Sequence, residues 1–271
     1  MSRGLLLKSA REVWGVTLLC GAGVLIFGII MGAVFRAFPM EKVDFWFEIE
    51  FIQKFAKALL GSEIGDRVNP NQFLIIRWVH PVILALVWAH EITLCTRLPA
   101  GEVDRGTIDA LFGLPVSRWR LYLCETLTMA VAGAFVVGLV LAGCLVGNIH
   151  TAPDARPSLA HSIVITCNLY CLYGAVGGLA FFVSSLSDRR GRAVATSFGI
   201  VVGSFFLSFV EQFWAPARHL SCLNLLSYYR PLLVMRDGAW PVTDMATLGC
   251  AGLVLWVAGG LILNRRDICT T

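Results

Sequence analysis

Six apolar runs, each long enough to cross a lipid bilayer, divide this chain of 271 residues. They cover residues 14–35, 73–96, 121–147, 159–186, 193–213 and 245–263. A helix needs about 20 mainly apolar residues to cross the hydrocarbon core. Because no water satisfies backbone groups there, such runs are expected to be α-helical. The sequence therefore predicts an all-α integral membrane protein, with residues 14–271 forming one domain of six transmembrane helices.

The composition agrees with this fold class and excludes several functions. Charged residues make up 15% of the chain, against about 25% in soluble domains. The four lysines form no basic run with interleaved aromatic residues, so we expect no nucleic-acid partner. The nine cysteines contain no CxxC pair, and neither a disulfide framework nor a zinc ribbon is predicted.

The polar loop at residues 97–120 is more patterned than a simple connection. Ile108, Leu111 and Leu114 recur every third position, which predicts a short amphipathic helix over residues 104–114. Asp104 or Thr107 is expected to cap its start. The helix is expected to end at Gly113 and Pro115, after which Ser117 would cap the next helix. An exposed apolar stripe beside charged residues is typical of a surface that binds a partner.

This loop reads Glu102-x-x-x-Gly106-Thr107-Ile108-Asp109-x-Leu111-x-x-Leu114-Pro115-Val116-Ser117-Arg118. The pattern resembles the cytoplasmic loop of the ABC-2 type transporter permeases, E-x-x-x-G-T-[LI]-[ED]-x-L-L-x-x-P-V-S-R. The short Arg265-Arg266-Asp267 tail after the last run is also similar to members of that family. One departure is Glu125, which stands near the place of a common basic residue.

The resemblance implies a function for the loop, namely a coupling helix that docks on a separate ATPase subunit. The coupling residues that it implies are Glu102, Asp104, Gly106, Thr107, Ile108, Asp109, Leu111, Leu114, Pro115, Ser117 and Arg118. It further implies a second permease copy or a paralogue, because six helices form half of a translocation pore. ATP and Mg²⁺ would be bound by the ATPase subunit, and this chain would carry no cofactor. Most such systems export their substrates, so export is expected.

The distribution of basic residues predicts the orientation in the plasma (inner) membrane. Six spans place both termini on one side, and the positive-inside rule makes that side and the 97–120 loop cytoplasmic. Residues 1–13 form a basic amphipathic stretch, expected as a cytoplasmic interfacial helix that contacts membrane lipid. The stretch also resembles the start of a signal peptide. The following run is too long for that and lacks a small-x-small cleavage site.

The external segments are expected at residues 36–72, 148–158 and 214–244. Polar residues recur at helical spacing from Glu50 onward, which predicts an external amphipathic helix. That helix either lies on the lipid surface or gates the exit of a pathway. Residues 214–244 hold several prolines and aromatic residues, which is typical of an interfacial or re-entrant segment.

Small residues and charges inside the runs predict how the helices meet. Small-xxx-small pairs, expected at helix contacts, occur at Gly28–Gly32, Gly143–Gly147, Gly174–Gly178 and Gly199–Gly203. The ionisable residues of the runs lie near predicted helix ends, and we expect them to reach outward to water; they are Arg77, Glu91, Glu125 and Glu211.

The sequence lacks the residues for ATP hydrolysis in this chain. No G-x-x-x-x-G-K-[ST] motif is present, so a nucleotide would be bound by another polypeptide, and the chain is expected not to be an enzyme. One alternative is a membrane redox or metal-binding subunit that uses His80, His90 or His161. Another is a membrane scaffold whose loop recruits a partner other than an ATPase.

Overall fold

The computed structural model describes residues 3–37, 49–51, 53–54, 74–149, 151 and 156–266, and these contain helices and no strand. Five helices are long and apolar enough to cross a membrane: α1 (Arg3–Ala37), α9 (Arg118–Gly147), α10 (Leu159–Leu186), α11 (Arg190–Phe213) and α13 (Val242–Arg265). Helix α6 (Pro81–Cys95) bends by 66° into a shorter helical segment, Arg97–Asp104, and the count of apolar helices rises to six if this bent pair is one span. The chain is thus an all-α membrane protein, as the sequence predicts.

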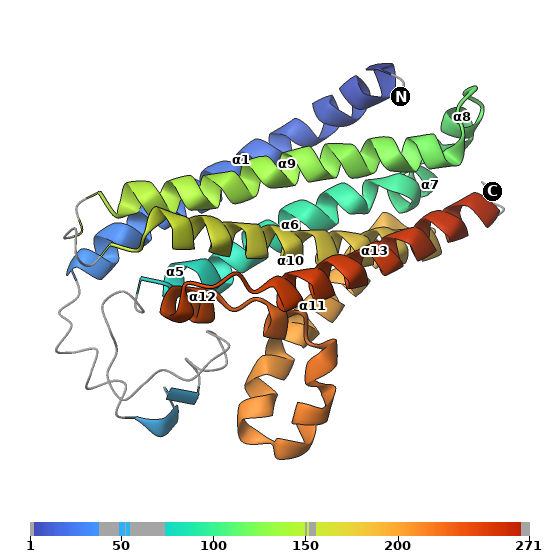
Figure 1. The fold of residues 1–271 in the computed structure, drawn as a ribbon. Coiled ribbons are helices and arrows are strands. Elements are labelled where there is room, and N and C mark those ends of the chain that lie inside the picture. Colours follow the sequence, from blue (N-terminus) through green and yellow to red (C-terminus); the bar gives the residue numbers. More distant parts are fainter. Residues whose placement is uncertain are drawn as a thin grey trace.

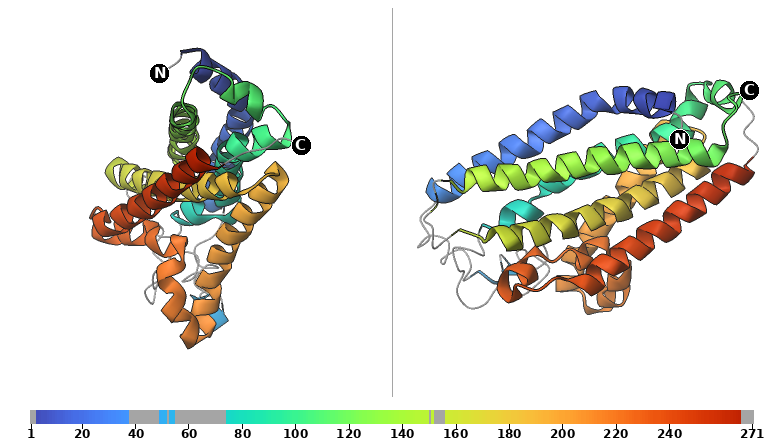
Figure 2. Two further views of the ribbon diagram at one scale, coloured as in Figure 1. Left: turned by 90° about the vertical axis from the view of Figure 1, so that its right-hand side faces the viewer. Right: turned by 45° about the horizontal axis from the view of Figure 1, so that its top comes forward.

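The two ends of the bundle differ in what they carry. Both chain termini and the short helix α8 (Ile108–Phe112) lie at the same end, which we call the loop end (Figure 1). The last turns of α1 and α9 lie at the other end, which we call the far end (Figure 1). The two further views show α1 and α9 running side by side along the length of the bundle (Figure 2).

The first helix extends further than the apolar run predicts. It is one continuous helix from Arg3 to Ala37, with no break where the sequence separates residues 1–13 from residues 14–35. A Lys8–Glu12 ion pair of 3.3 Å, one helical turn apart, supports the helix across this boundary. The basic stretch therefore continues the axis of the span and does not lie across it.

The second span is interrupted at Pro81. The short helix α5 (Ile76–Val79) ends at His80, whose backbone is extended, and Pro81 begins α6. Because proline lacks an amide proton and its ring clashes with the preceding turn, the helix restarts there. The side chain of His80 accepts a hydrogen bond from the amide of Val82 at 3.2 Å and so caps α6.

Glycine pairs set the two closest helix contacts of the fold. A Cβ atom on Gly28 would lie 2.8 Å from the backbone of Gly143, so α1 and α9 touch backbone to backbone. A Cβ on Gly252 of α13 would lie 2.8 Å from the carbonyl oxygen of Gly174 on α10. These contacts match the expected role of small residues. Gly199 and Gly203 of α11 have no neighbour within 4 Å of such a Cβ among the described residues.

After α11 the chain folds back along the bundle through two short 3₁₀ helices, η3 (Ala215–Leu223) and η4 (Leu225–Tyr228). Asn224, between them, is hydrogen-bonded to Ser204 and Ser208 of α11. Since Ser204 lies nine residues before the end of α11, Asn224 is about 13 Å below that end at 1.5 Å per residue. The segment η3–η4 is thus re-entrant. Helix α12 (Pro231–Asp237) follows it and leads to α13.

Two charged residues of the spans do not reach outward as expected. Arg77 is 1% exposed and donates to the Asn148 side chain at 2.7 Å and to the Cys144 carbonyl at 3.4 Å. It therefore satisfies groups at the far end of α9 that water would otherwise bind. Glu91 is fully buried, with one carboxylate oxygen directed at Gly177 of α10. Both expectations of snorkelling were wrong, because neighbouring helices cover these positions.

Candidate functional site

The loop between α6 and α9 folds into short pieces. A kinked segment, η1 (Arg97–Gly101), in which the backbone of Leu98 is extended, is followed by α7 (Glu102–Asp104) and then by α8. Gly106 separates α7 from α8 with φ of +67°, a left-handed conformation that glycine adopts without a side-chain clash. The amphipathic helix is consequently Ile108–Phe112, shorter than the expected residues 104–114.

The capping predictions for this loop have mixed outcomes. Ser117 caps α9, and its hydroxyl accepts from the amide of Arg120 at 3.3 Å, as the sequence predicts. Thr107 occupies the N-cap position of α8, but its hydroxyl donates to the Glu102 carboxylate and makes no cap hydrogen bond. Asp104 accepts instead from the amide of Arg190, at the start of α11, at 3.4 Å. Neither Asp104 nor Thr107 therefore caps α8 through its side chain.

The apolar stripe of α8 points mainly into the protein. Ile108 is completely buried, and Leu111 is partly buried against the same core. Only Leu114 remains exposed, at 43%. The stripe thus attaches the loop to the bundle, and the expectation that it forms an exposed surface was wrong for its first two residues. Seven of the residues expected to couple are exposed, and we call them the loop tip: Asp104, Gly106, Thr107, Asp109, Leu114, Pro115 and Ser117.

Glu102 is the acidic centre of this loop. It is 5% exposed, lies 3.3 Å from the ammonium of Lys8 on α1 and 3.5 Å from the guanidinium of Arg105, and accepts from Thr107. Burial alone would raise the pKa of the Glu102 carboxyl. The Thr107 hydrogen bond and the charges of Lys8 and Arg105 outweigh burial and hold this pKa below its ordinary value.

Arg97, close to Glu102, connects the loop to α1 and to α9. Its guanidinium pairs with Glu12 of α1 and lies 3.4 Å from the carboxylate of Glu125 on α9. Glu125 also accepts from the hydroxyl of Ser9 at 2.5 Å. Sequence reasoning named none of these residues as part of the site. One feature of the sequence could have indicated them: acidic and basic residues of α1, the loop and α9 fall at the same end of the predicted bundle, where they can form ion pairs.

Arg118 connects the loop to the last helix of the chain. Its guanidinium lies over the ring of Phe112, 4.4 Å from the ring centre. The same group donates to the carbonyl oxygens of Leu263 at 3.0 Å and Arg266 at 2.7 Å, at the C-terminus of α13. Such carbonyls have no partner within their own helix, so a cation there is favourable. Arg118 therefore connects α8 to the start of α9 and to the end of α13.

Arg266 continues this connection to a fourth helix. It donates to the carbonyl of Ser185 at 2.9 Å, at the end of α10, and pairs with Asp188 in the turn before α11. Loop, α9, α13 and α10 are therefore joined at the loop end by arginines bound to helix C-termini.

The family described as ABC-2 family transporter protein matches residues 11–239. The chain belongs to this family. No curated protein and no solved structure matches it. Membership makes the chain a permease, the membrane subunit of an ABC transporter, and the loop described above lies within the matched range.

Two of the histidines that could bind a metal, His80 and His90, contact other residues of this ABC-2 permease. The hydroxyl of Thr17 donates to the Val13 carbonyl at 2.9 Å, so it accepts from Nε2–H of His90 at 3.0 Å. Nδ1 of His90 lies 3.2 Å from the hydroxyl of Tyr173, which also contacts the Met129 carbonyl oxygen at 3.4 Å. Both ring nitrogens of His90 therefore have a hydroxyl within hydrogen-bond distance. His80 caps α6, and the described residues contain no cluster of three potential metal ligands.

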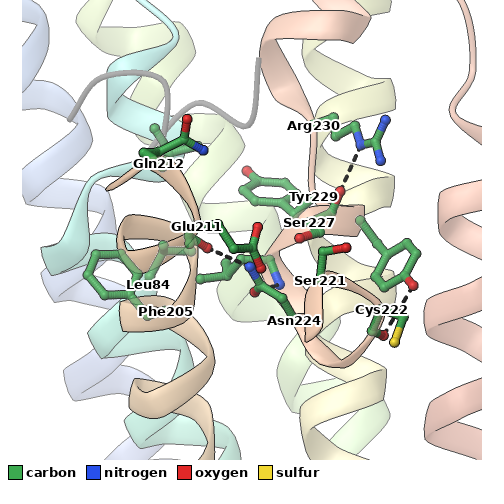
Figure 3. Close-up of a pocket in the computed structure, with 14 residues that line it drawn as sticks. Leu84, Phe205, Glu211, Gln212, Ser221, Cys222, Asn224, Ser227, Tyr229 and Arg230 are labelled. Atoms are coloured by element: carbon green, nitrogen blue, oxygen red, sulfur yellow. Dashed lines mark hydrogen bonds between the residues drawn. The ribbon is translucent and has the colours of Figure 1, made fainter. Parts of the chain in front are cut away.

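A polar pocket lies at the far end of the permease, between α11 and the re-entrant segment (Figure 3). Its volume is about 380 Å³. Glu211 and Gln212 extend from α11 on one side, and Ser221, Asn224 and Ser227 face them from the other. Asn224 is almost fully buried at the base of the pocket, where it accepts from Ser204 at 3.0 Å and donates to Ser208 at 2.8 Å. The sequence indicated a re-entrant segment here but not this pocket.

Proposed function

We propose that this chain is the permease of an exporter powered by a separate cytoplasmic ATPase subunit, which docks on the loop tip. Both termini and the loop would be cytoplasmic, in the plasma (inner) membrane. The support for this orientation is the gathering of basic residues at the loop end, on the side that the positive-inside rule makes cytoplasmic. These residues are Arg3, Lys8, Arg11, Arg97, Arg105, Arg118, Arg120, Arg189, Arg190, Arg192, Arg265 and Arg266.

The observation that carries the coupling proposal is the position of Arg118. It sits at the first turn of α9, directly after the loop tip, and holds the end of α13. A force applied by an ATPase to residues 104–117 is thus transmitted to two spans through one side chain. Rigid-body displacement of spans is an established way in which a small movement at one site opens another.

The other components of the transporter would be separate chains. ATP and Mg²⁺ would be bound by the ATPase, since this chain has no P-loop motif. A second permease copy or a paralogue would complete the pore. The polar pocket at the far end would form part of the exit, because it offers hydrogen-bonding groups where a substrate leaves the membrane.

The docking proposal is tested by changing the loop tip without disturbing its packing. Leu114→Glu alters a side chain that is 43% exposed, and the matched control Leu186→Glu alters one that is 54% exposed at the end of α10, outside the loop. Each tagged variant would be purified from membranes of the native host, and the P-loop ATPase recovered with it would be quantified. Loss of one central interface contact costs about 2 kcal/mol or more, so recovery should fall at least about tenfold for Leu114→Glu.

The control separates docking from a general effect of charge. Leu186→Glu is expected to retain the ATPase, and both variants should elute as folded protein. Equal recovery with Leu114→Glu and Leu186→Glu would refute the loop tip as the docking surface. If the wild-type permease itself brings down no ATPase, the export mechanism proposed above is wrong.

A further inference from the structure

A groove at the loop end lies over the last turns of α6, the helix on which both α1 and α11 pack. Its volume is about 250 Å³. One part of its wall is apolar and consists of Val13 and Val16 from α1 and Leu94 from α6. The rest of its wall is polar and consists of Glu12, Thr93, Arg97, Arg105 and Arg190.

The three arginines of the groove differ in how they are neutralised. Arg97 is held by Glu12 and Glu125, and Arg105 lies 3.5 Å from Glu102. The guanidinium of Arg190 donates to the carbonyl of Thr93 at 3.0 Å. Within the described part of the chain it forms no ion pair with a carboxylate, although the Asp104 carboxylate, which accepts from its backbone amide at 3.4 Å, partly offsets its charge.

Arg105 and Arg190 lie close together at one side of the groove, over Gly101. A Cβ atom on Gly101 would come within 3.2 Å of Cδ of Arg190 and 3.7 Å of a terminal nitrogen of Arg105. Two guanidinium groups this near each other repel, most strongly where water is partly excluded. The groove lining holds three arginines and one glutamate, so an added anion would relieve this repulsion.

We propose that this groove binds a phosphate group, with Arg190 and Arg105 donating to its oxygens. Guanidinium groups present paired N–H donors that match the oxygens of phosphate. The apolar wall of Val13, Val16 and Leu94 favours a phospholipid as the carrier of that phosphate, because an acyl chain can lie against it. Basic pockets between spans bind anionic headgroups in this manner. The ligand is thus an anionic phospholipid from the leaflet at the loop end.

The test measures phosphate binding by the purified permease without any ATPase, so it does not depend on the docking proposal. Short-chain phosphatidylglycerol, phosphatidylcholine and inorganic phosphate would each be titrated while thermal unfolding is followed in detergent. Native mass spectrometry would count the retained lipids. The variants are Arg190→Gln and, two residues later on the same helix, the exposed control Arg192→Gln.

Phosphatidylglycerol is expected to raise the unfolding temperature of the wild type and of Arg192→Gln. Its apparent affinity should fall about tenfold in Arg190→Gln, the loss that one charge-assisted hydrogen bond represents. Phosphatidylcholine should bind more weakly, because its headgroup carries no net negative charge. If Arg190→Gln fails to fold, Arg105→Gln takes its place, since that side chain is 51% exposed.

Three results would overturn parts of the proposal. Unchanged affinity in both Arg190→Gln and Arg105→Gln would show that the groove holds no phosphate. An equal effect of inorganic phosphate at the same concentration would keep the phosphate site and remove the lipid as its carrier. If no phosphate compound changes the unfolding temperature, and the groove is shielded from solvent only when a partner protein is bound, then the groove is a protein interface.

Discussion

The guanidinium of Arg118 donates to the carbonyl oxygen of Arg266 at 2.7 Å, although the two residues are 148 positions apart. This bond joins the start of α9 to the end of α13, and Arg266 in turn holds the end of α10. Together with the ion pairs of Arg97 and Glu102, these cationic caps are polar connections at the loop end. The loop between α6 and α9 is therefore attached to the bundle at several points.

Replacement of Arg118 should weaken this connection in a way that lysine cannot restore. Arg118→Lys keeps the charge but loses the planar group that lies over Phe112 and donates to two carbonyls at once. Loss of bonds to a charged group is expected to lower the free energy of unfolding by about 1.5–3 kcal/mol. Thermal unfolding in detergent would measure this. The control is Arg120→Lys, an exposed position that should change little.

The same variant separates stability from coupling. In a reconstituted complex, Arg118→Lys should hydrolyse ATP but transport less substrate per ATP than the wild type. Unchanged transport per ATP in a folded Arg118→Lys complex would mean that force passes from the loop to the spans by another route.

Gly106 is predicted to stabilise the fold only because glycine can adopt the left-handed backbone conformation at this position. A Cβ atom there has no neighbour within 4 Å, but φ is +67°, so Gly106→Ala should cost about 1–2 kcal/mol of stability. The comparison is Gly191→Ala, also in open space but within α11, where alanine should stabilise by about 0.5–1 kcal/mol. Opposite shifts in the unfolding temperature would support this account. Shifts of the same sign would contradict it.

Local patterns predicted most of the fold. The apolar run 159–186 coincides with α10, and Pro81 interrupts the second span where its missing amide requires it. The glycine spacing on α1 and α9 also predicted a close contact. These features depend on neighbours a few residues away, which a sequence displays directly.

Contacts between residues far apart in the sequence could not be predicted from local patterns. Arg77 was expected near the surface, but its partner Asn148 is 71 positions away. The direction of Ile108 was missed for the same reason, because an apolar stripe does not reveal whether its own bundle or a partner covers it. The sequence displays the loop residues, but it does not display their contacts with Ser9, Glu12 and Glu125.

The contact between α1 and α9 should tolerate no side chain at Gly32. A Cβ on Gly32 would overlap the carbonyl group of Gly147, so the two helices would have to separate. Overpacking of this kind costs about 1–3 kcal/mol, and Gly32→Ala should lower the unfolding temperature. Gly203→Ala on α11 is the matched control, since a Cβ there meets nothing within 4 Å. Equal effects of the two substitutions would mean that helix approach does not limit stability here.

Glu102 should give the loop end a dependence on pH. Its pKa lies below the ordinary value of 4.5, so the ionised form is favoured by folding. The resulting stabilisation is present above about pH 4.5 and is lost as the pH falls through the lower folded-state pKa. The difference in unfolding temperature between wild type and Glu102→Gln should therefore shrink in acid. A difference that stays constant from pH 7 to pH 3 would show that the charge of Glu102 is not what stabilises the loop.

The re-entrant segment should depend on Asn224, whose side chain bonds to two residues of α11 and to the backbone of Leu226 in the same segment. It accepts from the amide of Leu226 at 3.1 Å as well as from Ser204, and it donates to Ser208. In Asn224→Leu these buried groups lose their partner, at about 1–3 kcal/mol for an unsatisfied group. The unfolding temperature should fall, while Asn264→Leu at an exposed position should leave it unchanged. Because the same residue forms the base of the pocket, a stable Asn224→Leu protein with full transport would show that substrate does not pass this pocket.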